Sequence, residues 1–253
     1  MSKKTVDNVA STVIIVREEN PFQLFAELKD SSHPRPLVRG ALCTPGGNWV
    51  HDARFDSGPR DTHIREIWEE FTFNRLPRDQ QELAALGLSE DACGFQAATQ
   101  LAAEPTPKDR ATLAQIRNFV AFQATPWMAR INTITEEAWA SADPDNKKPT
   151  MSFWVNYFVV KLPEELWLGL MALQEHFGNL SAECISYVTN AEKMAKTSLR
   201  GAFCHDFALE AFWKENGFCK NLTHIPGTSS VVAGIVPETY ANLLEKVNVR
   251  NHP

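Results

Sequence analysis

Apolar residues gather in short runs near the N-terminus, and these runs predict strands. Residues 9–17 are rich in β-branched side chains, and 22–28 have an alternating apolar character after the turn signal at Pro21. We therefore expect these two runs to form a hairpin. A further short strand is expected over 37–43. The stretch 49–59 has no clean periodicity and is expected to be a loop.

After this loop the apolar period becomes helical, with apolar residues three and four positions apart. Asp61 or Thr62 is the expected N-cap, because short polar side chains accept hydrogen bonds from the first free N–H groups of a helix. The predicted apolar stripe consists of Ile64, Ile67, Trp68 and Phe71. We expect this stripe to pack on a sheet and the opposite face to stay polar.

Residues 75–150 carry mainly helical patterns and lie between β-rich flanks. We interpret them as a helical insertion within one domain that spans 1–253, rather than as a separate domain. The later helices of the insertion are expected to begin near Pro107 and Thr135. Pro126 is expected to end the first of these two helices or to start a turn.

The remaining third of the chain predicts strands and helices in alternation. Residues 151–162 have apolar side chains at both sets of alternating positions, so this strand is expected to be central and covered on both faces. Helices are expected over 163–176 and 205–215, and short strands over 185–188 and 229–236.

The composition is that of a soluble globular protein, with 253 residues of which 43% are hydrophobic and 22% charged. The formal net charge of -6 argues against general nucleic-acid binding, which depends on clustered Lys and Arg. The longest apolar stretch, 153–160, is too short to span a bilayer, and no apolar run typical of a secretion signal opens the chain. We expect a cytoplasmic protein without a membrane partner, and a homodimer stays open.

The cysteines predict no redox or metal chemistry. The five are widely spaced and form no Cys-x-x-Cys pair, so five reduced thiols are expected. Cys204, His205 and Asp206 have the residue types of a nucleophilic triad. Consecutive residues of a helix point about 100° apart, however, so these three cannot form a working triad among themselves.

Three carboxylates fall within five residues of the first predicted helix, at Glu66, Glu69 and Glu70. Side chains three and four positions apart share one helix face, so the three can converge. A divalent cation that prefers oxygen ligands, Mg²⁺ or Mn²⁺, would offset their repulsion, and Arg65 could pair with one of them. The alternative is a solvated acidic helix face, which is common.

The helix carries the run Arg65-Glu66-Ile67-Trp68-Glu69-Glu70-Phe71-Thr72-Phe73, and Pro45-Gly46-Gly47 precedes it. This arrangement resembles the signature of the Nudix hydrolase family. That signature is a Gly, five residues, a Glu, seven residues, and then Arg-Glu-apolar-any-Glu-Glu-any-Gly-apolar. The resemblance implies an α/β (α+β) fold, a Nudix-like α/β/α sandwich with a mixed sheet and, in this chain, a helical insertion.

The resemblance also implies a reaction, the hydrolysis of a pyrophosphate linkage in a small nucleotide. The substrate is then a nucleoside diphosphate linked to another group, or a nucleoside triphosphate. Such phosphoryl transfer needs metal ions to neutralise the phosphate oxygens and to position the water. The implied metal ligands are Glu66, Glu69 and Glu70, and the implied catalytic residues are Glu66, Glu70 and Arg65. The base that deprotonates the water is Glu66 or Glu70, with Glu183 as an alternative.

Five residues are expected to bind the substrate. Gly46 and Gly47 form the turn, and Trp49 beside them would stack on a nucleotide base, unless it caps the core instead. Phe25 and Arg39 lie on or near the first strands, where the family often builds its ligand cleft.

The signature is incomplete. The loop from Gly47 to Arg65 is longer than in the family, Thr72 replaces the closing glycine, and the loop glutamate is missing or replaced by Asp52 or Asp56. Two functions therefore stay open, an active hydrolase and a catalytically impaired nucleotide-binding sensor or regulator. A third, a helical protein-interaction module with an incidental acidic cluster, is disfavoured by the early strands.

Overall fold

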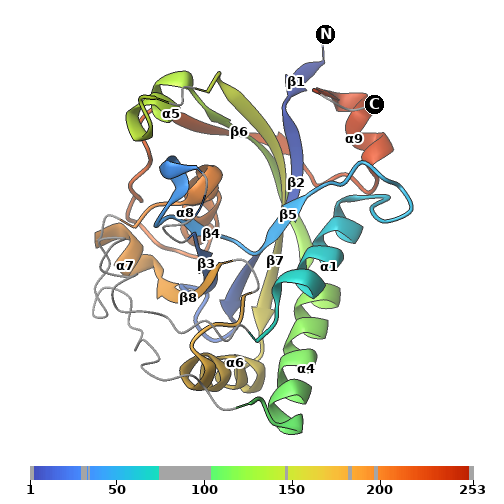
Figure 1. The fold of residues 1–253 in the computed structure, drawn as a ribbon, viewed down its shortest axis with the longest axis vertical. Coiled ribbons are helices and arrows are strands. Elements are labelled where there is room, and N and C mark those ends of the chain that lie inside the picture. The colour runs from blue at the N-terminus through green and yellow to red at the C-terminus, as the bar shows by residue number, and fades with distance from the viewer. Residues whose placement is uncertain are drawn as a thin grey trace.

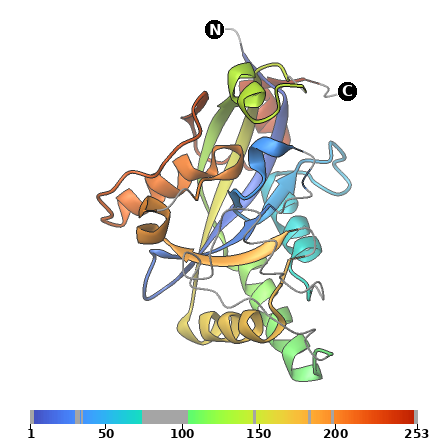
Figure 2. The same cartoon turned by 60° about the vertical axis from the view of Figure 1, so that its left-hand side comes forward.

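A twisted mixed sheet runs through the middle of the structure, and helices lie against both of its faces (Figures 1 and 2). The computed structural model describes residues 3–29, 33, 35–73, 104–145, 148–181, 184–196 and 199–250. Strands and helices alternate along the chain, and the sheet has both parallel and antiparallel pairs. The predicted α/β class with a mixed sheet is confirmed.

Two long strands form the centre of the sheet. Strand β2 (Asn8–Arg17) pairs in parallel with β7 (Met151–Leu162) along its whole length. Strand β6 (Thr125–Ile134) lies antiparallel on the other side of β7, and β9 (Thr228–Gly234) follows β6. Both faces of β7 are apolar because Val155 and Tyr157 belong to one core layer and Phe158 and Val160 to the other.

Two strands share the other side of β2. Near its C-terminal end β2 pairs with β3 (Gln23–Leu28), which confirms the predicted hairpin. Near its N-terminal end it pairs with β5 (Gly46–Asn48). Strand β3 also pairs with β8 (Ile185–Asn190) and β4 (Leu42–Cys43). The Gly-Gly segment of β5 therefore lies beside β2, the first long strand of the sheet.

The alternation along β2 divides the core into two layers. Val13 and Ile15 face one layer of helices, and Ile14 and Val16 face the other. The helices of the first layer are α1 (Pro59–Glu70), α4 (Pro107–Gln123) and α6 (Glu164–Phe177). Those of the second are α5 (Glu136–Ala142), α7 (Ala191–Lys196) and α8 (His205–Glu215). None of the helices in the described part of the chain has the length and apolar character that crossing a membrane requires.

A small second sheet joins the two ends of the described chain. Strand β1 (Lys4–Val6) pairs in parallel with β10 (Val247–Val249), which follows α9 (Tyr240–Lys246). Their side chains bury an apolar cluster of their own that includes Trp49 and Trp154. This cluster ties the chain ends to the start of the long central strands.

Helix α1 differs from its prediction in two respects. It begins at Pro59 rather than after Asp61 or Thr62, because the first helical residue needs no N–H partner and proline is already restrained to a helical φ. Its apolar stripe is also incomplete. Trp68 is 42% exposed, and the guanidinium group of Arg117 lies over its ring. Trp68 therefore lies at the surface and does not pack on the sheet.

The strand expected over 37–43 is mostly absent. The 3₁₀ helix η1 (Pro36–Val38) occupies its first part, and only β4 at its end is extended. Pro36 restrains φ at the first position of η1, which favours this turn over a strand.

The stretch 75–150 is not purely helical. Helices α4 and α5 confirm two predicted helices, but β6 lies between them and supplies an inner strand of the main sheet. Pro126 lies in β6 at a register shift, where a strand tolerates a residue without an N–H group. The helices predicted before residue 104 lie outside the described residues. The assignment of 75–150 as an insertion within one domain stays a prediction.

Candidate functional site

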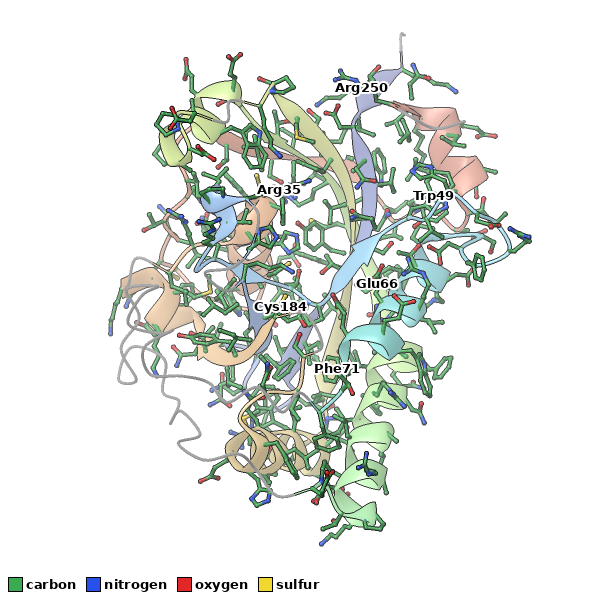
Figure 3. All side chains as sticks on the ribbon, in the orientation of Figure 1. Arg35, Trp49, Glu66, Phe71, Cys184 and Arg250 are labelled. Atoms are coloured by element: carbon green, nitrogen blue, oxygen red, sulfur yellow. The ribbon has the colours of Figure 1, made fainter. Side chains whose placement is uncertain are left out.

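Helix α1 lies against strand β5, and the side chain of Glu66 occupies the space that a Cβ atom at Gly47 would need (Figure 3). A Cβ atom at Gly47 would lie 2.3 Å from the carboxyl group of Glu66, so this carboxylate fills the space of the missing methyl group. Gly46 has a φ of +144°, and a Cβ atom there would lie 2.3 Å from the carbonyl oxygen of Ser11. The N–H of Gly46 donates to Oε2 of Glu70 at 2.7 Å. Two predicted site carboxylates therefore meet the Gly-Gly segment.

Arg65 donates hydrogen bonds to three carboxylates. Its Nη1 donates to Glu66 at 2.7 Å and to Glu69 at 3.0 Å. Its Nε and Nη2 donate to the two oxygens of Asp56 at 3.1 and 2.9 Å. Burial lowers the pKa of Arg65, but its contacts with Asp56 and Glu66 outweigh this effect and raise it. The predicted pairing of Arg65 with the acidic cluster is therefore present in the structure.

The two candidates for the missing loop glutamate lie in different places. Asp56 is buried, and its contact with Arg65 is bidentate, a geometry that fixes the direction of the guanidinium group. Asp52 pairs instead with Arg54 at the surface, at 2.6 Å. Asp56 is therefore the loop carboxylate that joins the helix, although it lies one residue before the position that the signature spacing indicates.

Glu70 is the most buried of the three helix carboxylates, with 4% of its surface exposed. Burial raises its pKa well above the usual value, and the negative charges of Glu27 and Glu66 raise it further. The ammonium group of Lys29 and the N–H of Gly46 oppose this shift without cancelling it. The site is therefore a group of carboxylates that repel one another, with Lys29 near Glu70 and Arg65 paired with Glu66.

Glu27 is a member of this group that the sequence reading missed. It lies on β3, is 2% exposed, and accepts a hydrogen bond from the hydroxyl group of Ser181 at 2.5 Å. The available signal was a charged residue in an otherwise apolar run. Lys29, two positions later, donates to Sγ of Cys184 at 2.9 Å. Glu183, the alternative base, lies outside the described residues.

Trp49 occupies its alternative role, that of capping the core. It is 7% exposed and belongs to the apolar cluster near the chain ends. Its ring stacks on Tyr240 at a centroid distance of 4.1 Å and packs against His51 at 4.3 Å. This placement favours packing over base stacking, and a contact between Trp49 and substrate stays a prediction.

Phe25 and Arg39 are not placed together. Phe25 is buried and packs on Phe71 with a centroid distance of 5.2 Å, so it supports the end of α1 from the sheet. Arg39 is exposed and donates from Nε to the carbonyl oxygen of His33 at 2.7 Å. Phe25 therefore acts through packing, whereas Arg39 would reach a ligand only from the surface.

The chain matches no family profile, and a search of curated proteins also gives no match. A solved structure, described as a NUDIX hydrolase from Alicyclobacillus acidocaldarius, aligns over 76% of this chain and 82% of its own. The identity is 14% and the TM-score 0.32. That structure bears the name of the family whose signature the sequence resembles.

The carboxylates of the site are suitable ligands for a divalent cation, but they are not arranged around a single metal position. Carboxylate oxygens are the ligands that Mg²⁺ and Mn²⁺ prefer, and Glu66 and Glu70 of α1 both contact the Gly-Gly segment of β5. Within the described residues, however, no three His, Cys, Asp or Glu side chains are grouped so that they could hold a metal ion. Glu66 and Glu69 instead point to Arg65. A three-carboxylate metal site would therefore require side-chain rearrangement.

Proposed function

We propose that the protein is a metal-dependent hydrolase that cleaves a pyrophosphate linkage in a small nucleotide. The observation that carries the proposal is the meeting of Glu66 and Glu70 at the Gly-Gly segment, beside the buried carboxylate of Glu27. Carboxylates gathered in this way repel one another, so a bound cation would stabilise the group. A pyrophosphate is an anion that such a cation can neutralise.

The residues of the site would have different roles in binding the cation and in hydrolysis. Glu66 and Glu70 would hold the cation, and Glu69 would join them if its carboxylate left Arg65. Bound Mg²⁺ or Mn²⁺ supplies charge neutralisation on the phosphate oxygens. Arg65 forms an ion pair with Asp56, and its Nη1 donates to Glu66 and so positions this carboxylate. Glu66 and Glu70 are also the candidates for taking the proton of the attacking water.

The test is turnover of three kinds of substrate: a dinucleotide, a nucleotide sugar and a nucleoside triphosphate, each with Mg²⁺ or Mn²⁺. We expect Glu66→Gln and Glu70→Gln to lower kcat by at least about 100-fold, because the loss of a group that only hydrogen-bonds to a metal ligand already costs about 10- to 100-fold. Glu245→Gln is the matched control, since Glu245 is an exposed helical glutamate on α9. No turnover of any substrate, or equal turnover by all variants, would contradict the proposal.

The second candidate is a nucleotide-binding sensor without hydrolysis. The observation that favours it is the engagement of Glu66 and Glu69 by Arg65, which removes two of the three predicted metal ligands. This candidate predicts nucleotide binding that is unchanged by EDTA, together with no turnover. The hydrolase predicts diphosphate binding that weakens when the metal is removed, so one titration with and without EDTA separates the two.

A further inference from the structure

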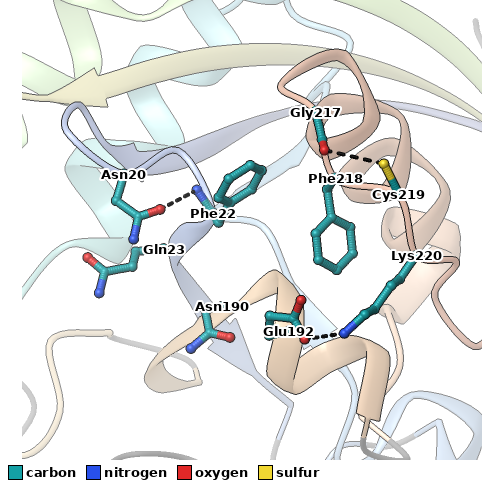
Figure 4. Close-up of a pocket in the computed structure, with 9 residues that line it drawn as sticks. All are labelled: Asn20, Phe22, Gln23, Asn190, Glu192, Gly217, Phe218, Cys219 and Lys220. Carbon is teal, nitrogen blue, oxygen red and sulfur yellow. Dashed lines mark hydrogen bonds and ion pairs between the residues drawn. The ribbon is translucent and has the colours of Figure 1, made fainter.

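A second candidate site lies at the opposite end of β3 from Glu27. It is an open pocket of about 500 Å³ between the turn that joins β2 to β3, the start of α7 and the segment after α8 (Figure 4). Gln23 and Glu27 are four residues apart on an extended strand, which corresponds to about 13 Å. The volume is within the usual range for small-molecule sites, about 300–1,000 Å³.

Three carboxamide side chains line one side of this pocket, and the protein itself fixes their orientation. The N–H of Phe22 donates to Oδ1 of Asn20 at 3.2 Å. Nη1 of Arg17 donates to Oε1 of Gln23 at 3.1 Å, and the N–H of Lys193 donates to Oδ1 of Asn190 at 2.9 Å.

Each carboxamide oxygen is therefore already used as an acceptor. In the part of the chain that the structure describes, none of the three NH₂ groups has a hydrogen-bond acceptor. The pocket lining consequently carries three carboxamides with unused donor groups, which suit ligand acceptors such as carbonyl oxygens.

The rest of the pocket adds apolar ring surface and one ion pair. Phe22 and Phe218 lie with their ring centroids 5.9 Å apart, and Phe218 is held in place by Trp213. At the mouth, Nζ of Lys220 lies 2.5 Å from Oε2 of Glu192. The Glu192 carboxylate is exposed and can accept a hydrogen bond from a ring N–H group.

We propose that this pocket binds the base of a nucleoside with ring carbonyl groups, such as uridine. A flat ring suits the two phenylalanines, because aromatic rings pack face to face with an offset or edge to face. The carbonyl oxygens of the base accept from the carboxamide NH₂ groups, and its ring N–H donates to Glu192. Adenosine lacks ring carbonyl groups and offers its own NH₂ group to donors, so it binds more weakly. The site is independent of the activity proposed at α1.

The first test is a ligand-observed NMR titration of the full chain with uridine and with adenosine, both in EDTA. Without metal and without phosphate, neither ligand tests the carboxylate site, so the two proposals fail separately. We expect a dissociation constant for uridine on the order of 0.1–1 mM, the range for a ligand of about 17 heavy atoms. Adenosine should bind at least about fivefold more weakly, the equivalent of one hydrogen bond.

Three variants remove the donors but preserve the local contacts: Asn20→Asp, Gln23→Glu and Asn190→Asp. Each new carboxylate still accepts the hydrogen bond that the amide oxygen accepts now, so folding is retained. Each variant should raise the dissociation constant for uridine about five- to tenfold. Asn242→Asp is the control, since Asn242 is exposed on α9, accepts from Thr239 and acquires the same charge.

Cys219 provides a second readout because it is an exposed thiol in the pocket wall. Bound uridine should slow its alkylation by iodoacetamide, followed for this residue by mass spectrometry. Three results would each overturn the proposal: no binding of uridine, equal binding of uridine and adenosine, or equal binding by the three variants and the control.

Discussion

At the scale of single residues, Gly47 and Glu66 depend on one another, because the Glu66 carboxylate lies where a side chain at position 47 would be. The glycine leaves the space, and the carboxylate of Glu66 fills it while Arg65 holds the carboxylate from the other side. A contact of this kind is specific to a pair rather than to either residue. It can therefore be measured as a coupling between two substitutions.

We expect Gly47→Ala to destabilise the protein by about 1–3 kcal/mol, because the added methyl group must displace Glu66. In a Glu66→Ala background the same change should cost much less, since the displaced group is gone. The free energy of unfolding in urea, measured for both single variants and the double variant, gives the coupling. An equal cost of Gly47→Ala in both backgrounds would show that the contact is absent.

At the scale of elements, His63 links α1, α4 and the sheet. It is fully buried, its Nε2 lies 3.1 Å from the carbonyl oxygen of Val120 on α4, and its ring stacks on Phe158 of β7. Burial lowers the pKa of His63 to about 4. The packing of α1 against its neighbours is therefore built around a neutral imidazole.

This depressed pKa makes part of the stability dependent on pH. The unfolded chain binds a proton at His63 below about pH 6.5, whereas the folded protein does so only near pH 4. The contribution is thus complete above pH 6.5 and is lost as the pH falls to 4, at a cost of about 3 kcal/mol.

Unfolding in urea at pH 7 and at pH 4.5 measures this loss. We expect His63→Gln to flatten the pH dependence relative to the wild type, because glutamine takes up no proton in this range. His176→Gln, a change at an exposed position on α6, should leave the dependence as it is. If both variants follow the wild type, His63 does not carry the effect.

At the scale of the whole molecule, the two chain ends close the fold. Val247 and Val249 of β10 are buried in the cluster near the chain ends, and Arg250 pairs with Asp7 at 2.9 Å. Figure 3 labels Arg250 at the top of the molecule, next to the N-terminal strand. Residues more than 230 positions apart in the sequence therefore pack as one unit.

Removal of all residues after Lys246 should lower the free energy of unfolding by about 3–6 kcal/mol, because two buried valine side chains are lost at about 1.5–3 kcal/mol each. A shorter truncation after Arg250 keeps β10 and serves as the control. Denaturant unfolding of the two truncated chains is the measurement. Equal stability of both would mean that β10 contributes nothing to the fold.

Local patterns in the sequence determined the elements with clear periodicity. The hairpin of β2 and β3, the central strand β7 and helices such as α6 and α8 were predicted, because each is encoded by residues only a few positions apart. The clustering of Glu66, Glu69 and Glu70 on one helix followed from the same local spacing.

Only the tertiary structure decided which distant groups join that helix. Glu27 comes from another strand, and Asp56 from a loop whose length departs from the expected spacing, so no local pattern relates them to Glu70 or Arg65. The same reason explains why β6 was not predicted, because its extended conformation is stabilised by pairing with β7 and β9 and not by a local pattern. Periodicity determines the elements, whereas long-range contacts determine the site.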